Sequence, residues 1–177
     1  MSKKGKIIFA GAIILLAAAS RLVKHPFNFT PVVAMSIFSG CYLRKRWGLV
    51  LPLGAMLVSD YFIGFYNWQV MVSVYLSIAL AFGIGWRLKK RKRWLNIALA
   101  SILSSVIFFV ITNFAVWTFF NWYPHTLPGL LSCFTLALPF FRNSFIGDLA
   151  YTGIFFGIYE SFPFLVQKFS QQKTAQI

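Results

Sequence analysis

Long apolar segments dominate this sequence of 177 residues and limit what it can fold into. Stretches of about 20 mostly apolar residues alternate with short basic or polar connections, and a helix of that length crosses the hydrocarbon core of a bilayer. Charged residues make up only 11% of the chain, whereas a soluble domain carries about 25%. The pattern predicts an all-α polytopic membrane protein with about six transmembrane helices, at about 7–23, 31–43, 47–66, 70–86, 95–120 and 145–166.

One further apolar stretch, 127–141, is short and contains Pro128 and Pro139. Because proline removes a backbone donor and clashes with the preceding turn, we expect a short re-entrant or surface hairpin here, before the last helix. Gly153 and Gly157 form a GxxxG pattern, which favours close packing of the last helix within the chain. We expect a single transmembrane domain over 1–166 and a polar cytoplasmic tail over 167–177.

Basic residues are strongly biased to one side of this layout. The chain has 17 Lys and Arg residues against 3 acidic residues, a formal net charge of +14. Connections rich in Lys and Arg face the cytoplasm, so we expect a multi-pass protein with both termini cytoplasmic. The basic run 87–93 fits this topological role, which we favour, or a site for anionic lipid or nucleic acid.

Several kinds of chemistry have no support in the sequence. Cys41 and Cys133 lie in apolar runs without metal or redox spacing, so no metal site is expected. No glycine-rich phosphate loop occurs, and we expect no cofactor. No nucleophile and base occur at a recognisable spacing, which makes a membrane enzyme the least favoured class.

Most of the remaining polar residues map to the opposite, outer side of the predicted bundle. Ionisable groups inside a membrane are costly and usually face the protein interior or a water-filled cavity. They fit structural ion pairs, with Arg21 and Arg142 as partners of Asp60 and Asp148, or an outward-facing ligand pocket, and both interpretations can hold together. The candidate ligand-binding residues are His25, Asn28, Asp60, Asn113, Trp117, Arg142, Asn143, Asp148 and Tyr151.

Short motifs occur in order along nearly the whole chain. They include HPFNFTPV at 25–32, FSG at 38–40, NFAVW at 113–117, PFFRN at 139–143 and GD at 147–148. With these motifs the chain resembles an uncharacterised bacterial membrane family that is described as a family of transport proteins. The layout of that family is similar to the substrate-binding S components of energy-coupling-factor (ECF) vitamin transporters.

The resemblance implies a six-helix protein of the bacterial cytoplasmic (inner) membrane with an outward-facing ligand site. It also implies a coupling subunit that contacts small residues of the first helix, for which the candidates here are Ala10, Ala12, Ala17 and Ala18. Ordinary packing of these alanines within the chain is an equal alternative.

Two functions remain in competition. The first is a substrate-binding integral membrane subunit of a transporter for a small, vitamin-like molecule, energised by a separate ATPase module. The second is an accessory or scaffold subunit of a larger membrane protein complex. In both cases the partners are the lipid bilayer and other membrane subunits, and no nucleic acid is expected.

Overall fold

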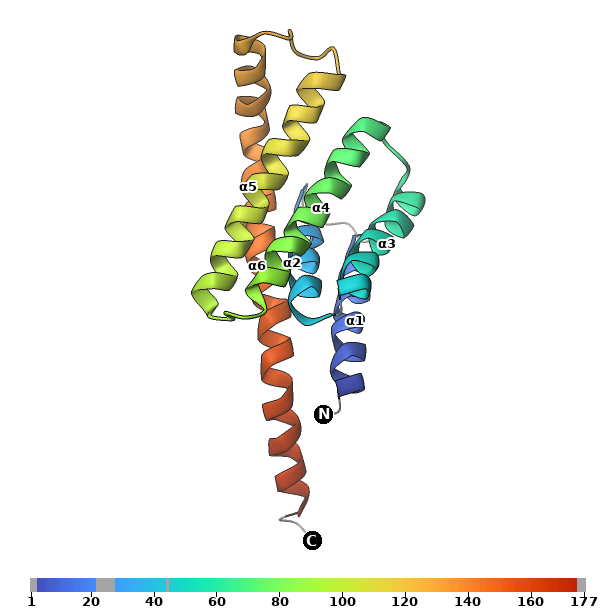
Figure 1. The fold of residues 1–177 in the computed structure, drawn as a ribbon, viewed down its shortest axis with the longest axis vertical. Helices are drawn as coiled ribbons and strands as arrows, with labels where there is room; N and C mark the ends of the chain where they lie inside the picture. Colours follow the sequence, from blue (N-terminus) through green and yellow to red (C-terminus); the bar gives the residue numbers. More distant parts are fainter. Residues whose placement is uncertain (1–2, 22–27, 44, 175–177) are drawn as a thin grey trace.

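The structure, a computed structural model, describes residues 3–21, 28–43 and 45–174. These residues form an all-helical protein, which confirms the predicted fold class (Figure 1). The helices are α1 (Lys3–Ser20), α2 (Val32–Tyr42), α3 (Lys45–Ile63), α4 (Trp68–Leu88), α5 (Trp94–Phe119) and α6 (Leu127–Thr174).

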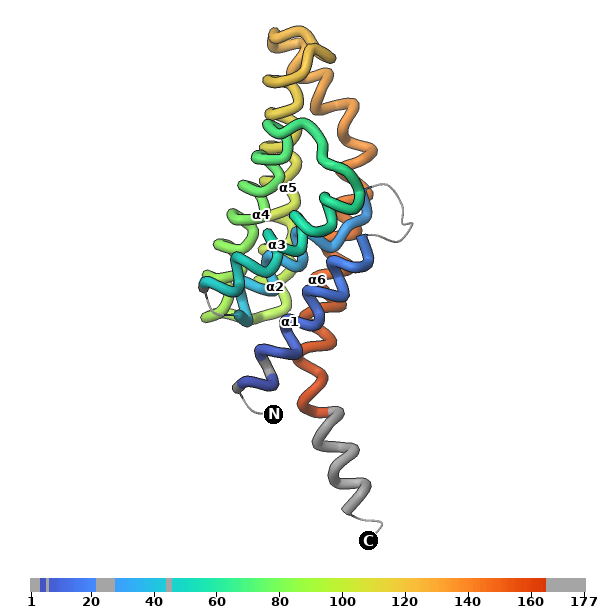
Figure 2. Tube along the Cα trace, turned by 90° about the vertical axis from the view of Figure 1, so that its right-hand side faces the viewer, coloured from blue at the N-terminus to red at the C-terminus, as the bar shows by residue number. Residues whose placement is uncertain are grey.

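The helices run alternately up and down along one long axis (Figures 1 and 2). α1 begins and α6 ends at the same end of the molecule as the basic α4–α5 connection, Lys89–Arg93. The α5–α6 connection lies at the opposite end, where α5 and α6 extend beyond α1, α2 and α3. At this end, the hairpin of α5 and α6 is therefore longer than the bundle formed by the first three helices.

α2 lies at the centre of the bundle. Every residue from Val32 to Cys41 is buried, and the helix contacts each of the other five. Phe38 packs edge-on against two aromatic rings of α6, with centroids 5.4 Å from Phe156 and 5.5 Å from Tyr159. This helix is apolar on all sides because it has no exposed face.

α2 and α4 approach closely at two facing glycines. A Cβ atom at Gly40 would lie 2.3 Å from the carbonyl oxygen of Phe82, and one at Gly85 would lie 2.1 Å from that of Ile37. The two backbones can come this close only because both positions lack a side chain. The GxxxG prediction for α6 is wrong, because a Cβ at Gly153 or Gly157 would meet nothing within 4 Å.

The predicted hairpin over 127–141 is also wrong, because these residues are the first turns of the continuous 48-residue helix α6. Pro128 lies in the first turn, where its missing N–H is not needed. Pro139 lies inside the helix, and the adjoining Phe141 stacks on Phe109 of α5 with centroids 4.4 Å apart. Packing against a neighbouring helix stabilises this segment despite the backbone hydrogen bond that the proline removes.

Among the described residues, three helices are long and apolar enough to cross a membrane: α4, α5 and the part Leu127–Phe164 of α6. This is fewer than the predicted number of about six. α2 has only 11 residues, about 16 Å of helix, and α3 carries Lys45, Arg46 and Asp60, which lower its mean hydropathy. α6 continues to Thr174, so the predicted tail begins as helix.

Candidate ligand-binding cavity

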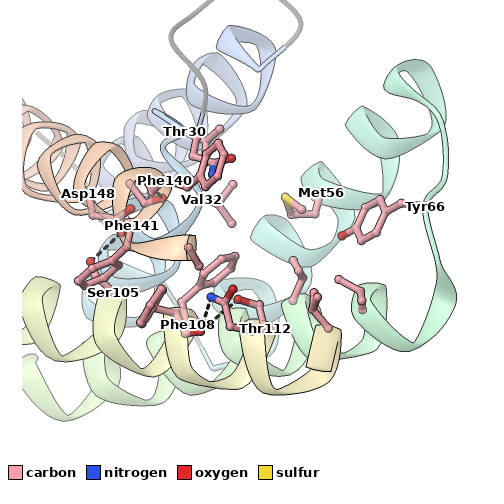
Figure 3. Close-up of a pocket in the computed structure, with 18 of the residues that line it drawn as sticks. Thr30, Val32, Met56, Tyr66, Ser105, Phe108, Thr112, Phe140, Phe141 and Asp148 are labelled. Atoms are coloured by element: carbon pink, nitrogen blue, oxygen red, sulfur yellow. Dashed lines mark hydrogen bonds between the residues drawn. The ribbon is translucent and has the colours of Figure 1, made fainter. Parts of the chain in front are cut away.

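A cavity of about 450 Å³ lies in the half of the molecule away from the basic α4–α5 connection. It is lined by the end of α1 and the segment that leads into α2, by α3 and the first half of α4, and by α5 and α6. Figure 3 shows Asp148 and Ser105 on one side of this cavity and Met56 and Tyr66 on the other. The cavity exists because α2 begins part-way along the bundle while α5 and α6 continue past it.

Arg21 and Asp60 form a buried ion pair beside the cavity. The Arg21 Nη2 atom lies 3.1 Å from Asp60 Oδ1, with the side chains 13% and 2% exposed. Tyr75 donates a hydrogen bond of 3.1 Å to the other carboxylate oxygen, and Arg21 also donates to the Ser59 hydroxyl. This is one of the ion pairs expected from the sequence, and it joins the end of α1 to α3 and α4.

Only part of that ion pair faces the cavity. Arg21 is a lining residue, whereas Asp60 is not. The Nε atom of Arg21 is buried and has no hydrogen-bond partner among the described residues. Asp60 is therefore a positioning group for Arg21, and it is not a direct part of the cavity wall.

Asp148 of α6 is the second acidic group of the site, and it lines the cavity itself. Its side chain is 4% exposed, and the Ser105 hydroxyl of α5 donates a hydrogen bond of 2.6 Å to its Oδ2 atom. Within the described part of the chain, ion pairs join Arg21 to Asp60 and Lys92 to Glu160, and none involves Asp148. Arg142, the partner expected from the sequence, is exposed.

Aromatic and aliphatic side chains form most of the wall between these polar groups. Phe108 and Phe109 come from α5, and Phe140 and Phe141 come from α6. Sequence analysis missed all four, since phenylalanines in an apolar helix give no signal that separates a cavity wall from a lipid-facing surface. Because the sequence contains 21 phenylalanines, the four that line the cavity do not stand out.

Thr112 and Asn113 supply polar atoms to the same wall. Thr112 Oγ1 donates to the carbonyl oxygen of Phe108, and Asn113 Nδ2 donates to that of Phe109, each over 2.8 Å. These donors are satisfied within α5 itself. Of the two, only Asn113 was predicted as a ligand-binding residue.

The segment before α2 contributes Asn28, another predicted residue. Asn28 has a φ of 60°, a left-handed conformation that asparagine adopts more readily than most residues. Across the cavity, Tyr66 follows α3 in the connection to α4. Burial and the nearby Asp60 raise the pKa of Tyr66 to about 12, so its phenol is neutral at physiological pH.

Other predicted residues lie away from the cavity. Trp117 donates from Nε1 to the carbonyl oxygen of Pro124 over 3.0 Å, and His125 Nε2 donates back to the Trp117 carbonyl oxygen over 2.8 Å. These hydrogen bonds hold the α5–α6 connection against the last turn of α5. Tyr151 packs on Phe29, with ring centroids 5.4 Å apart.

The structure thus separates the predicted ligand-binding residues into two groups. Asn28, Asn113 and Asp148 line one cavity. Trp117, Arg142, Asn143 and Tyr151 do not line it, Asp60 acts through Arg21, and His25 lies outside the described residues.

The alanines proposed as a partner interface do not share one surface. Ala10 and Ala17 are buried in the core at 0% and 5% exposure. Ala12 is exposed, and Ala18 lines an open apolar groove between α1 and α3, which also includes Leu15 and Val58. Of the four, only Ala12 and Ala18 are therefore accessible to a partner.

Over the part of the chain that the structure describes, fold and site define an all-helical protein with three helices long and apolar enough to cross a membrane. It has a cavity with a buried carboxyl group in its wall. The chain belongs to a family of unknown function (DUF6580), which matches residues 1–172. Neither the curated proteins nor the solved structures gave a match. The family match agrees with the predicted membership in an uncharacterised family and carries no functional assignment.

Proposed function

We propose that this protein is a substrate-binding integral membrane subunit of a transporter for a small, vitamin-like molecule. The observation that carries the proposal is the cavity of about 450 Å³, which is bordered by several helices. Ligand pockets for small molecules span about 300–1,000 Å³ and combine apolar walls with a few placed polar groups. This cavity has both, in Phe108 and Phe141 and in Arg21 and Asp148.

The direction of transport follows from the charge distribution. If the basic connection Lys89–Arg93 faces the cytoplasm, the cavity lies in the outer half of the membrane and takes its ligand from outside. The sequence contains no phosphate-binding loop. Release to the cytoplasm must then be driven by a separate ATPase module, with a coupling subunit in contact with this chain. We propose that this membrane is the cytoplasmic (inner) membrane of a bacterium.

The alternative function is a scaffold subunit of a larger membrane complex. The apolar groove between α1 and α3 supports it, since Leu15, Gly54 and Val58 leave an open surface there. The same groove suits a coupling subunit, so it does not separate the two functions. A cavity with a buried acidic side chain suits ligand binding better than a purely structural role, and for this reason we favour ligand binding.

Native mass spectrometry of the protein, purified from its native membranes in mild detergent, tests the proposal. We expect a small-molecule adduct on the 20.2 kDa chain. The adduct should disappear in Ala137→Trp, which fills the cavity from α6. It should persist in Ala150→Trp, a matched change at an exposed position of the same helix.

Two results would count against ligand binding. An adduct that survives Ala137→Trp would lie elsewhere on the chain. Stoichiometric protein partners without an ATPase, together with no adduct, would favour the scaffold.

A further inference from the structure

We infer that the cavity binds an organic cation, an apolar and partly aromatic molecule whose ammonium or similar group is held by Asp148. The inference rests on the proposed function of the cavity as a ligand site and names the class of ligand. It follows from the charges that the described residues place around the cavity.

Arg21, the one basic side chain among the described residues that line the cavity, is already neutralised. Arg21 is bound to Asp60 over 3.1 Å, and the second oxygen of that carboxylate accepts a hydrogen bond from Tyr75. Arg21 therefore offers the cavity a neutral ion pair with one unused donor at Nε. It does not provide the free positive charge that an anionic ligand would need.

Asp148, in contrast, forms no ion pair with any described residue. It is 4% exposed, and among the described residues it accepts a hydrogen bond of 2.6 Å from the neutral hydroxyl of Ser105. A carboxylate has about four lone-pair positions, and an unpaired buried charge is strongly unfavourable. The geometry leaves room at Asp148 for a positively charged donor, and the cavity is the open space that it faces.

The surroundings of Asp148 favour an organic cation over a metal ion or a bare inorganic cation. Phe140 and Phe141 line the same cavity as Asp148 (Figure 3), and aromatic faces attract ammonium groups. Ca²⁺ and Mg²⁺ need about six oxygen ligands, whereas the described residues contain no cluster of three or more His, Cys, Asp or Glu side chains. A volume of about 450 Å³ is also far larger than an ion requires.

Three probes with the same indole ring and two-carbon linker test the inference: tryptamine, tryptophol and indole-3-propionate, which are cationic, neutral and anionic. Their affinities for the purified full-length protein in detergent are measured by titration calorimetry at constant ionic strength. We expect tryptamine to bind at least about tenfold more tightly than tryptophol, and indole-3-propionate to bind most weakly.

Two variants identify the residue responsible. Asp148→Asn keeps the shape of the side chain and an acceptor for Ser105, and it should reduce tryptamine affinity to that of tryptophol. Thr118→Val is the control on α5 outside the cavity lining, because that hydroxyl is likewise bonded within its own helix, and it should retain the preference for the cation. If Asp148→Asn does not fold, the ranking of the three probes on the wild-type protein decides.

Other results would overturn the inference. Equal or tighter binding of tryptophol or indole-3-propionate to the wild-type protein would leave the cavity as a ligand site but remove its preference for cations. Stabilisation by Na⁺ alone that depends on Asp148 would assign the carboxylate to an inorganic ion. Failure of all three probes to bind would also overturn it, and only the additional absence of a co-purified small molecule would overturn the proposed function as well.

Discussion

The ion pair between Arg21 and Asp60 offers a sharp test of how this bundle is held together. Arg21→Met removes the guanidinium group but keeps an apolar side chain of similar length. The carboxylate of Asp60, which is 2% exposed, then retains only the hydroxyl of Tyr75 as a described partner. We expect the variant to be strongly destabilised, because a buried charge has lost its counter-charge.

The size of the effect follows from the geometry. Two unit charges 3.1 Å apart attract by about 5 kcal/mol at an effective dielectric constant of about 20. A carboxyl group can escape an unpaired buried charge by taking up a proton, and at neutral pH this costs about 4 kcal/mol. We therefore expect Arg21→Met to lower the free energy of unfolding by about 3 to 5 kcal/mol.

The double variant with Asp60→Asn separates charge from packing. It contains neither charge, and the asparagine can still accept the hydrogen bond from Tyr75. The double variant should therefore be more stable than Arg21→Met alone, although it carries one more substitution. A double-mutant cycle, measured by denaturant unfolding in mixed micelles with tryptophan fluorescence as the signal, gives the coupling energy.

Two outcomes would refute this reasoning. If Arg21→Met lowers the free energy of unfolding by less than about 1 kcal/mol, the ion pair contributes no more than an exposed one. That result would mean that water or lipid head groups reach the site. A double variant whose loss equals the sum of the two single losses would show that the two groups are not coupled.

Three further predictions concern other parts of the bundle. Gly85→Ala should lower the free energy of unfolding by about 3 kcal/mol or more, because the new Cβ would lie 2.1 Å from the Ile37 carbonyl oxygen. Gly83→Ala is the control, because a Cβ there has open space around it, and it should be neutral or stabilise by up to about 1 kcal/mol. Thermal unfolding compares the two variants, and equal effects would contradict the close α2–α4 contact. Glu160→Gln should lower the free energy of unfolding by no more than about 1 kcal/mol, since its carboxylate is 50% exposed, and the loss should shrink at high salt; a large loss that salt does not change would be unexpected. Trp117→Phe should speed hydrogen exchange in the α5–α6 connection, because the variant loses the 3.0 Å hydrogen bond to the Pro124 carbonyl oxygen. It should leave small-molecule binding unchanged, and weaker binding would mean that this tryptophan belongs to the ligand site.

The sequence predicted the helices well where local composition decides. The starts and ends of α4 and α5 lie within a few residues of the predicted segments, because charged or polar clusters bound both apolar runs. The first part of α6 was missed because proline was given its usual effect on an isolated helix. Packing of Phe141 against Phe109 is a tertiary contact, and no local pattern around Pro139 reports it.

The candidate site was predictable in part, since Asn28, Asn113 and Asp148 line the cavity. A carboxylate in an apolar helix stands out against its neighbours, and Asp60 and Asp148 both became part of a polar network. Which arginine pairs with which acid depends on helix rotation and depth, and these follow from the whole bundle. Close approach was misplaced for a similar reason, since neither Gly40 nor Gly85 is part of a GxxxG pattern.

Two prolines, Pro139 and Pro163, lie inside α6 and divide the helix into three stretches. A backbone hydrogen bond is missing at Pro139 and at Pro163, so bending concentrates at these points and the stretch between them behaves as a stiff rod. That rod carries Asp148 in the cavity wall and, about 18 Å further on, Glu160, which lies 3.7 Å from Lys92 of the basic connection. A displacement of this stretch along its axis would therefore move Asp148 and Glu160 together.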